Sequence, residues 1–372
     1  MESDIRTSVF FQPTFGNRPE CIVGRDGEIT SFLQGLKEPI GSHNRCTLFF
    51  GQRGMGKTAL LLELEDQAED NGYIAVRTTV REGLADEIIE QIQFKGAHLF
   101  KDDKRRLTGI NAGVLGFSFG LTFSDETRKQ FGFRTKLSML CDRLAEKKKG
   151  ILLLIDEVHS SPEMREIATS YQELVGDGKN IAIAMAGLPY AISSVLNDKV
   201  LTFLNRAKKV ELGLISIPAI KDYYEYAFSD LGIMYDDKVL EDAASATQGM
   251  PYLMQLIGYY LVQLSRSTRA ISAAILEKAR IAAISDLESN VFAPILNPLS
   301  KNDRFFLQAM AEEGEVIEVS SLQKRLGNKA SSFQPYRRRL IDAGIVESPR
   351  NGRLVFAVPH LAEYLRNNPI QL

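Results

Sequence analysis

The eight residues from Gly51 to Thr58 constrain the fold of this chain more than any other segment. They read Gly51-Gln52-Arg53-Gly54-Met55-Gly56-Lys57-Thr58, which matches the pattern G-x-x-x-x-G-K-[ST] of a phosphate-binding P-loop. In such a loop the glycines let the backbone wrap a polyphosphate, and the following helix, here from about Ala59, points its positive end at it. Lys57 is expected to reach the β- and γ-phosphates, and the Thr58 hydroxyl is expected to hold Mg²⁺. The segment Gly51–Ala59 is therefore the predicted phosphate cradle.

Apolar strands alternate with helical segments around this loop. Residues Cys46–Phe50 form a short apolar strand before it. The run Ile151–Ile155 is continuously apolar, as expected at the centre of a parallel sheet that is buried on both faces. Further strands are expected at residues 73–78, 181–186 and 209–212, and helices at 22–36, 83–93 and 134–149. This alternation predicts an α/β fold with a doubly wound parallel sheet.

Charge, cysteine content and hydropathy limit the class of protein. The 372 residues carry a net charge of -2, so any contact with nucleic acid has to be local. The start Met1-Glu2-Ser3-Asp4 does not resemble a signal peptide, and no apolar run is long enough to span a membrane. The three cysteines are far apart and the four histidines are scattered, which argues against a disulfide framework and a structural zinc site. A cytoplasmic protein is the prediction.

The segment between the second strand and the third carries an expected insertion. Residues Gly113–Phe123 are rich in glycine and aromatics and partly alternate, which predicts a β-hairpin. A basic patch precedes this hairpin, and we interpret it as a solvated charge run rather than a DNA contact. The patch consists of Lys101, Lys104, Arg105 and Arg106.

Three domains are expected along the chain. The first contains the P-loop and opens with an extended arm that runs to about Pro19. The second has almost entirely helical periodicity, and a break at Asn297-Pro298 separates it from a final compact unit. The predicted domains are residues 1–213 with an insertion at about 97–133, residues 214–295 and residues 296–372.

Two acidic residues end the buried strand at 151–155. Asp156 would lie at the carboxyl end of the sheet, where open α/β sheets bind ligands, and its carboxylate would hold Mg²⁺. Glu157 is placed to orient and polarise an attacking water. We interpret His159 as a polar residue at a strand end rather than as a catalytic base. The pair therefore predicts hydrolysis of the bound nucleotide.

The order of strands suggests which division of P-loop proteins this is. The strand over residues 73–78 lies between the P-loop and Asp156 in sequence, and we expect it to separate the two motif strands in the sheet. With the Asp156-Glu157 pair, an intervening strand matches the division that uses a catalytic glutamate. The base-reading motif Asn-Lys-x-Asp is absent from the sequence, which favours ATP over GTP.

Beyond these motifs, nearly the whole chain resembles a known family. The box Val23-Gly24-Arg25-Asp26-Gly27-Glu28 looks like the "hhGRExE" box of signal-transduction ATPases and of origin-recognition/Cdc-type AAA+ ATPases. The resemblance places Gly24 and Arg25 near the adenine. Leu204-Asn205-Arg206 is similar to the box that carries an arginine finger, and Gly249-Met250-Pro251 to the "GxP" motif of the helical lid. The nearest relatives would be prokaryotic ATPases with a C-terminal winged helix.

Two departures from this family pattern concern its polar sensors. The strand that ends at Met185-Ala186-Gly187 offers no Asn or Thr side chain at the usual sensor position. The helix after Gly249-Met250-Pro251 has no arginine in its first two turns. Both losses favour a slow nucleotide switch over fast, coordinated hydrolysis. Arg206 is open to two interpretations: a finger supplied to a neighbouring subunit, or a surface arginine.

The last domain is predicted to be a winged helix-turn-helix. Helices are expected at residues 303–312, around residues 319–326, and from about residue 332. A hairpin follows, with the turn signature Asn351-Gly352 at its tip. From residue 297 to the end there are 11 Lys and Arg against 8 Asp and Glu, so this unit is mildly basic.

DNA contacts are assigned to the third helix of this unit and to the hairpin tip. A helical wheel turns Ser331, Gln334, Arg338 and Arg339 outward and keeps Arg337 nearer the core edge. The helix would enter the major groove, while Arg350 and Arg353 would meet the DNA backbone or minor groove. The alternative is a winged helix that contacts protein or docks on its own ATPase.

Three functions are consistent with this sequence. The first is a switch that binds double-stranded DNA under the control of ATP with Mg²⁺, with assembly into a homo-oligomer through Arg206. The second is a signalling ATPase whose winged helix binds protein. The third, a remodelling motor, is disfavoured because neither a pore loop nor strong sensors are evident.

Overall fold

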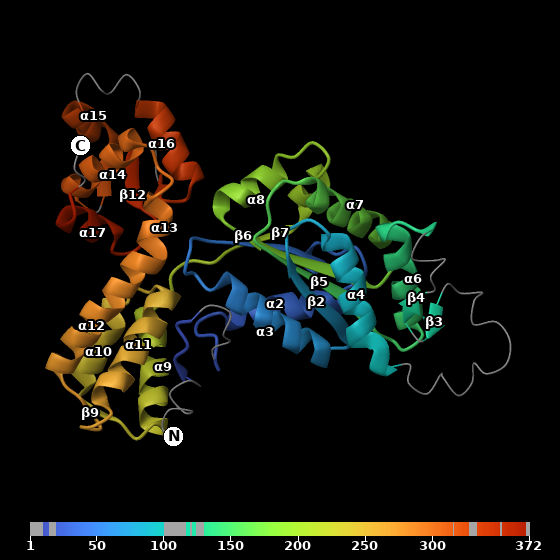
Figure 1. Ribbon diagram of the computed structural model, residues 1–372, viewed down its shortest axis with the longest axis horizontal. Coiled ribbons are helices and arrows are strands. Elements are labelled where there is room, and N and C mark those ends of the chain that lie inside the picture. The colour runs from blue at the N-terminus through green and yellow to red at the C-terminus, as the bar shows by residue number, and fades with distance from the viewer. Residues whose placement is uncertain are drawn as a thin grey trace. The chain divides into compact units, whose positions relative to one another are not determined.

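The computed structural model describes residues 10–14, 20–99, 117–119, 121–123, 130–314, 316–326, 333–349 and 352–369 (Figure 1). The chain divides into two compact units. The sheet unit comprises Arg25–Phe50 and Lys57–Glu211. The helical unit comprises Met1–Gly24, Gly51–Gly56 and Leu212–Leu372. Among the described residues, no helix is both long and apolar enough to cross a membrane.

The sheet unit is built on five parallel strands in the order β2-β5-β6-β1-β7. All seven residues of β5 and of β6 are buried, because both strands have neighbours on each side and helices on both faces. The strands are β1 Cys46–Phe50, β2 Tyr73–Thr79, β5 Gly150–Asp156, β6 Ile181–Gly187 and β7 Lys208–Glu211. The prediction of an α/β fold with a parallel sheet is confirmed.

One part of the predicted strand order was wrong. The strand β2 does not separate the two motif strands β1 and β5, because among the described strands it pairs with β5 alone and is the first strand of the sheet. The strand between them is β6, which follows both motifs in sequence. Neighbours in a parallel sheet are set by the crossover connections and not by sequence order. The expected intervening strand therefore exists, but a different segment supplies it.

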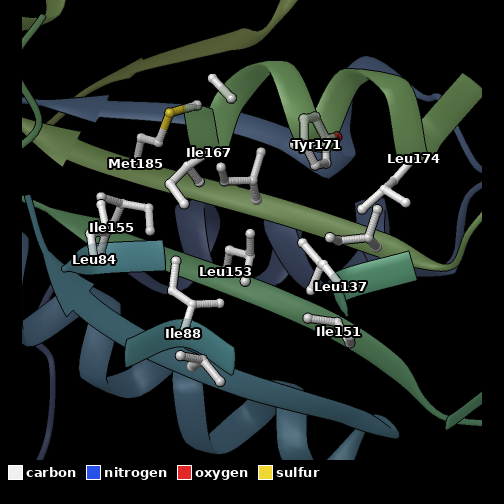
Figure 2. Packing of buried hydrophobic residues seen from close by; sticks show 14 of the residues in the cluster. Leu84, Ile88, Leu137, Ile151, Leu153, Ile155, Ile167, Tyr171, Leu174 and Met185 are labelled. Carbon is white, nitrogen blue, oxygen red and sulfur yellow. The ribbon is translucent and has the colours of Figure 1, made fainter. Parts of the chain in front are cut away.

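Helices cover both faces of this sheet. On one face, Ile151, Leu153 and Ile155 of β5 pack against α4, α6 and α7 (Figure 2). On the other, α3 contacts β2, β5 and β6, and its buried leucines lie outside that cluster. Side chains alternate along a strand, so β5 serves both cores. The helical segments of this unit are α2 Asp26–Lys37, η1 His43–Arg45, α3 Lys57–Asp70, α4 Leu84–Gly96, α6 Phe133–Ala145, α7 Pro162–Gly176, α8 Pro189–Leu196 and η3 Thr202–Arg206.

A short antiparallel hairpin lies within the expected insertion. Strand β3, Phe117–Phe119, pairs with β4, Thr122–Phe123, which confirms the predicted hairpin. Leu121 and Phe123 are buried and join the core that α4 and α6 form. The basic patch from Lys101 to Arg106 lies outside the described residues.

The helical unit begins with a bundle that the chain's own N-terminal segment completes. Phe11 is 1 % exposed and stacks edge-on against Tyr223 and Tyr224. The Tyr223 hydroxyl donates a 2.7 Å hydrogen bond to the carbonyl of Phe10. The described part of the expected arm is therefore part of a core. The elements of this bundle are α9 Ile217–Asp230, β8 Met234–Tyr235, α10 Asp237–Ala246, α11 Pro251–Ser265, β9 Ala270–Ile271, α12 Ala273–Leu287, η4 Glu288–Phe292 and α13 Ala293–Leu296.

The last elements follow the order predicted for a winged helix. A three-stranded antiparallel sheet, in the order β10-β12-β11, accompanies the three expected helices, α14 to α16, and a further short helix, α17. Strand β10 was not predicted, since Val316–Glu318 is too short to show a clear alternation. Its central residue Ile317 is fully buried. The elements are α14 Lys301–Glu313, β10 Val316–Glu318, α15 Val319–Leu326, α16 Phe333–Asp342, β11 Val346–Glu347, β12 Arg353–Phe356 and α17 Leu361–Asn367.

Candidate functional site

The sheet unit brings the two predicted motif ends together. The Thr58 hydroxyl at the start of α3 donates a 2.7 Å hydrogen bond to Oδ2 of Asp156 at the end of β5. The other carboxylate oxygen, Oδ1, accepts the backbone N–H of Glu157 at 2.9 Å. Asp156 is 4 % exposed, so its carboxylate is held in one orientation by both partners. Two residues 98 positions apart in sequence thus meet at the carboxyl end of the sheet.

The donor set at this position suits a hard cation. A hydroxyl and a carboxylate both offer oxygen, which Mg²⁺ prefers, and Mg²⁺ keeps water and phosphate oxygens for its remaining positions. Within the described parts of the chain, no group of three or more His, Cys, Asp or Glu side chains is arranged to hold a metal by itself. Thr58 and Asp156 therefore fit a cation that arrives with phosphate.

Glu157 has an unusual backbone conformation. Its φ is +51°, in the left-handed region that glutamate seldom adopts, and its side chain is exposed. The next residue, Val158, is buried, and its N–H donates a 2.9 Å hydrogen bond to the carbonyl of Ala186 in β6. His159 is exposed, with Nδ1 3.1 Å from the carbonyl of Glu157. Residues held in such conformations cluster at functional sites.

The missing sensor side chain on β6 has a steric explanation. A Cβ atom on Gly187 would lie 3.1 Å from both the carbonyl oxygen and a methyl group of Val158. The loop after Asp156 therefore lies directly against the end of β6 at Gly187. A side chain at residue 187 would require Val158 to shift by a few tenths of an ångström.

Within the helical unit, the P-loop glycines lie against the start of α11. Gly54 and Gly56 have φ values of +80° and +81°, which favour glycine. The carbonyl of Gly54 accepts the N–H of Tyr252 at 3.2 Å. A Cβ on Gly54 would lie 2.4 Å from the Met250 side chain and 3.2 Å from that of Tyr252. Pro251, from the predicted lid motif, is the first residue of α11, and its Cβ lies 3.9 Å from where a Gly56 Cβ would stand.

Replacing Gly54 by Ala is therefore expected to abolish nucleotide binding and to destabilise the fold. A left-handed alanine costs about 1–2 kcal/mol, and the added methyl group also presses on Met250. Gly72 is a matched control, because its φ is +90° and nothing lies within 4 Å of its missing Cβ. Equilibrium unfolding and titration with a fluorescent ATP analogue check both variants. Equal loss of nucleotide binding in Gly72→Ala would contradict a specific role for Gly54.

The predicted adenine box is divided between the two units. Gly24, in the helical unit, has a φ of +67°, and its missing Cβ would lie 3.0 Å from the Ile215 side chain. Arg25, in the sheet unit, is 6 % exposed. Burial lowers the pKa of its guanidinium, and Glu28 at 3.9 Å partly offsets that effect. Of the remaining predicted cradle residues, Gly51, Gln52 and Met55 are buried, Arg53 is exposed, and Lys57 and Ala59 are partly buried.

Gln52 has a neighbour that the sequence did not suggest. It is 8 % exposed, and a Cβ on Gly344, in the turn after α16, would lie 2.4 Å from its Oε1. Gly344 has a φ of +66°, which favours glycine, and a Cβ there would force the flexible end of the Gln52 side chain to move. Within the helical unit, the P-loop therefore touches the C-terminal elements.

Arg206 lies at the other end of the sheet from the motif residues. It is exposed at the end of η3, two residues before Lys208, which pairs with Thr47 near the amino end of β1. From Thr47 to its last residue, Phe50, strand β1 extends about 10 Å towards the carboxyl end of the sheet. Arg206 is therefore remote from Thr58 and Asp156 of its own chain.

The predicted DNA-contacting residues have different surroundings. Gln334 and Arg338 are exposed on α16, with 86 % of the Arg338 side chain accessible. Ser331 and Arg350 lie outside the described residues. Arg337 is partly buried, as expected, and donates to Ser348 at 2.9 Å.

The prediction that Arg339 simply points outward was incomplete. It donates a 2.7 Å hydrogen bond to the buried carboxylate of Asp303 on α14, and its guanidinium lies 4.9 Å from the ring centre of Tyr336. A helical wheel ignores such partners on neighbouring helices. Arg353 is likewise paired, with Glu318 of β10 at 2.9 Å.

Solved structures share this fold. A Walker-type ATPase of Pyrococcus abyssi is 16 % identical, with a TM-score of 0.66 over 94 % of this chain and 97 % of that one. The ORC2 protein of Aeropyrum pernix, solved as ADPNP–ADP complexes, is 16 % identical, with a TM-score of 0.65 over 95 % of each chain. At this identity the likeness is one of fold, and it supports the predicted α/β architecture with a parallel sheet.

Sequence comparison adds one partial match. A family model described as a domain of unknown function, DUF8462, matches residues 289–365. No curated protein matches the chain in sequence. The match covers the C-terminal elements and leaves the P-loop and Asp156 outside it.

Proposed function

We propose that this chain is an ATPase that binds ATP with Mg²⁺ at the P-loop and hydrolyses it slowly. The main observation is the hydrogen bond between the Thr58 hydroxyl and the Asp156 carboxylate. Glu157, whose side chain is exposed, directly follows Asp156. Thr58, Asp156 and Glu157, whose side chains suit phosphate hydrolysis, thus lie together at the carboxyl end of the parallel strands. If Asp156 were only an acidic residue exposed to solvent at the end of a strand, a hydrogen bond to the hydroxyl of the P-loop Thr58 would not be expected.

The residues of the site have separate tasks in this proposal. The P-loop backbone and Lys57 hold the β- and γ-phosphates, and Thr58 and Asp156 hold the cation. Mg²⁺, when bound, supplies positive charge to the phosphate oxygens. Glu157 orients a water and accepts its proton as the oxygen attacks the γ-phosphorus. The bond to the β-phosphate oxygen breaks, so the products are ADP and inorganic phosphate.

Two features support slow turnover. Gly187 ends β6 without a side chain, so β6 offers no polar sensor group there that could contact a γ-phosphate. Arg206 is remote from its own motif residues and would have to act on a second copy of the chain. An arginine finger supplied in this way typically adds about 10³-fold or more to turnover. A single chain would then hydrolyse ATP slowly, and ATP would stay bound to it for a long time.

We further propose that the bound nucleotide controls DNA binding by the C-terminal winged helix. The P-loop contacts α11 through Gly54 and Tyr252, and it touches the turn after α16 through Gln52. A change in the P-loop on ATP binding would reach both elements. The exposed Gln334 and Arg338 on α16 would then contact double-stranded DNA.

Protein recognition by the same winged helix is the second candidate. Arg339 and Arg353 are both engaged in ion pairs with Asp303 and Glu318. These ion pairs reduce the positive charge that the winged helix presents to DNA phosphates. They therefore favour protein recognition over DNA binding. If the winged helix binds DNA, the exposed Arg338 should contribute to DNA affinity. If it binds protein, Arg338 should not affect DNA affinity.

Reversing the charge of Arg338 separates the two candidates. The change Arg338→Glu is expected to weaken DNA binding by about 1–3 kcal/mol, roughly 5- to 150-fold, if α16 contacts DNA. Lys278→Glu is the matched control, because Lys278 is also exposed on a helix but belongs to α12. Mobility-shift assays at low salt, with ATP, ADP and no nucleotide, give the affinities.

Two outcomes of this assay would change the proposal. Unchanged DNA retention in Arg338→Glu would remove DNA binding by α16 and favour protein recognition. Equal DNA affinity in all three nucleotide states would remove the switch while leaving ATP binding intact. The variant Lys57→Ala should behave like the nucleotide-free wild type throughout.

A further inference from the structure

A buried carboxylate, that of Asp198, connects two segments of the sheet unit. Asp198 lies between α8 and η3, and its side chain is 3 % exposed. Its Oδ2 accepts hydrogen bonds from Ser160 Oγ at 2.5 Å and from Arg165 Nε at 2.8 Å. Its Oδ1 accepts the N–H of Val200 at 2.9 Å. The contacts with Ser160 and Arg165 therefore link Asp198 to a loop and a helix that are distant in sequence. The contact with Val200 stabilises the turn that Asp198 itself begins.

The carboxylate remains charged under ordinary conditions. Hydrogen bonds from Ser160 and the N–H of Val200, together with the nearby Arg165, lower the pKa of Asp198 to about 2. A charged, buried acceptor with three donors is strongly oriented, because losing any one of them leaves charge poorly compensated.

On one side, Asp198 holds the loop that follows Glu157. Ser160 is three residues after Glu157, and Val158 between them donates its N–H to Ala186 of β6 at 2.9 Å. The loop is thus attached at Val158 to β6 and at Ser160 to Asp198. Glu157 itself has the left-handed φ of +51°, so its position depends on these attachments.

On the other side, Asp198 begins the segment that carries Arg206. Its carbonyl accepts the N–H of Leu201 at 3.1 Å, and the carbonyl of Leu201 accepts that of Leu204 at 2.9 Å. Leu201 and Leu204 are fully buried. Asn205, next to Arg206, donates through Nδ2 to the carbonyl of Leu196 at 3.1 Å. The segment from Asp198 to Arg206 is therefore a continuous turn, held by successive hydrogen bonds and by two buried leucines.

We propose that Asp198 is a positioning residue that couples the loop of Glu157 to the segment of Arg206. A shift of Glu157 when ATP replaces ADP would pass through Ser160 to Asp198 and reorient Arg206 at the far end of the sheet. The inference rests on the proposed ATP binding. Through this coupling, the bound nucleotide could change the position of Arg206 even though Gly187 provides no polar side chain at the end of β6.

Hydrogen exchange with and without nucleotide tests this coupling. In the wild type, the non-hydrolysable analogue ADPNP with Mg²⁺ should change amide protection at residues 51–58 and also, by about fivefold relative to ADP, at residues 198–206. In Asp198→Asn the change at residues 51–58 should remain and that at residues 198–206 should disappear. Asp142→Asn is the matched control, because Asp142 forms an exposed ion pair with Lys179 at 2.6 Å.

A second variant guards against loss of the fold. Ser160→Ala removes a single hydrogen bond to Asp198 and should reduce the response at residues 198–206 while the thermal transition stays close to that of the wild type. In both variants kcat should fall and the dissociation constant for ATP should stay within about twofold, which a merely structural defect would not produce.

The outcomes distinguish this proposal from the proposed function. A wild type that responds at residues 51–58 but not at 198–206 would overturn the coupling and leave ATP binding in place. A full response in Asp198→Asn would overturn it as well. If ADPNP leaves residues 51–58 unchanged in the wild type, ATP binding itself fails, and the coupling fails with it.

Discussion

Replacing Glu157 by Gln is expected to slow ATP hydrolysis by about 10²- to 10⁴-fold, or about 3–5 kcal/mol in activation free energy. Glutamine keeps the size and hydrogen-bonding shape of the side chain but cannot accept the proton of the attacking water. Thr58, Asp156 and the P-loop are unaffected, so ATP should still bind with nearly wild-type affinity. Single-turnover hydrolysis and the ATP retained after gel filtration measure the two quantities.

The control for this experiment is His159→Gln. His159 is exposed two residues further along, and its Nδ1 lies near the carbonyl of Glu157, so a general effect on the loop would appear there as well. We expect a change in rate of no more than about threefold, since no proton transfer depends on it. Full activity in Glu157→Gln, or loss of ATP binding, would remove Glu157 from the catalytic role proposed for it.

Replacing Phe11 by Ala should cost about 3–5 kcal/mol of stability in the helical unit. The ring is 1 % exposed and packs against Tyr223, Tyr224 and Phe228. It also fills the space over Gly258, where a Cβ would lie 2.1 Å from the Phe11 ring. Surrounding side chains relax only partly around a cavity of this kind, so most of the loss should remain.

Denaturant unfolding, followed by circular dichroism, measures this loss. Phe94→Ala is the matched control, because the Phe94 side chain is on α4 and the residue is 85 % exposed, so its removal should change stability by no more than about 0.5 kcal/mol. Similar midpoints for Phe11→Ala and the wild type would mean that residues 10–14 do not contribute to the core of the bundle.

The parts of the fold that the sequence predicted are those with local signals. The P-loop pattern and the apolar run before Asp156 each lie within one continuous segment. Parallel strands place their carboxyl ends at the same edge, so the proximity of Thr58 and Asp156 followed from the two motifs together. The exposed side chain of Arg338 followed from helical periodicity in the same way.

The features that were missed depend on contacts between distant segments. The place of β2 at the sheet edge is set by crossover connections, which strand sequences do not encode. The burial of Phe11 depends on Gly258, almost 250 residues later, and an aromatic near Pro and Gly in sequence resembles a loop. The pairing of Asp303 with Arg339, and of Asp198 with Ser160, leaves no periodic or motif signal at all.

The position of η3 at the amino end of β1 has a consequence for reaction order. If Arg206 acts as the arginine finger proposed for it, its distance from its own Thr58 and Asp156 means that it would act on a phosphate bound by another copy of the chain. In that case, the part of the specific activity that depends on Arg206 should rise with protein concentration, and dilution should return each chain to its slow intrinsic rate. The number of copies gathered in one place, more than the supply of ATP, would then set the lifetime of the bound nucleotide.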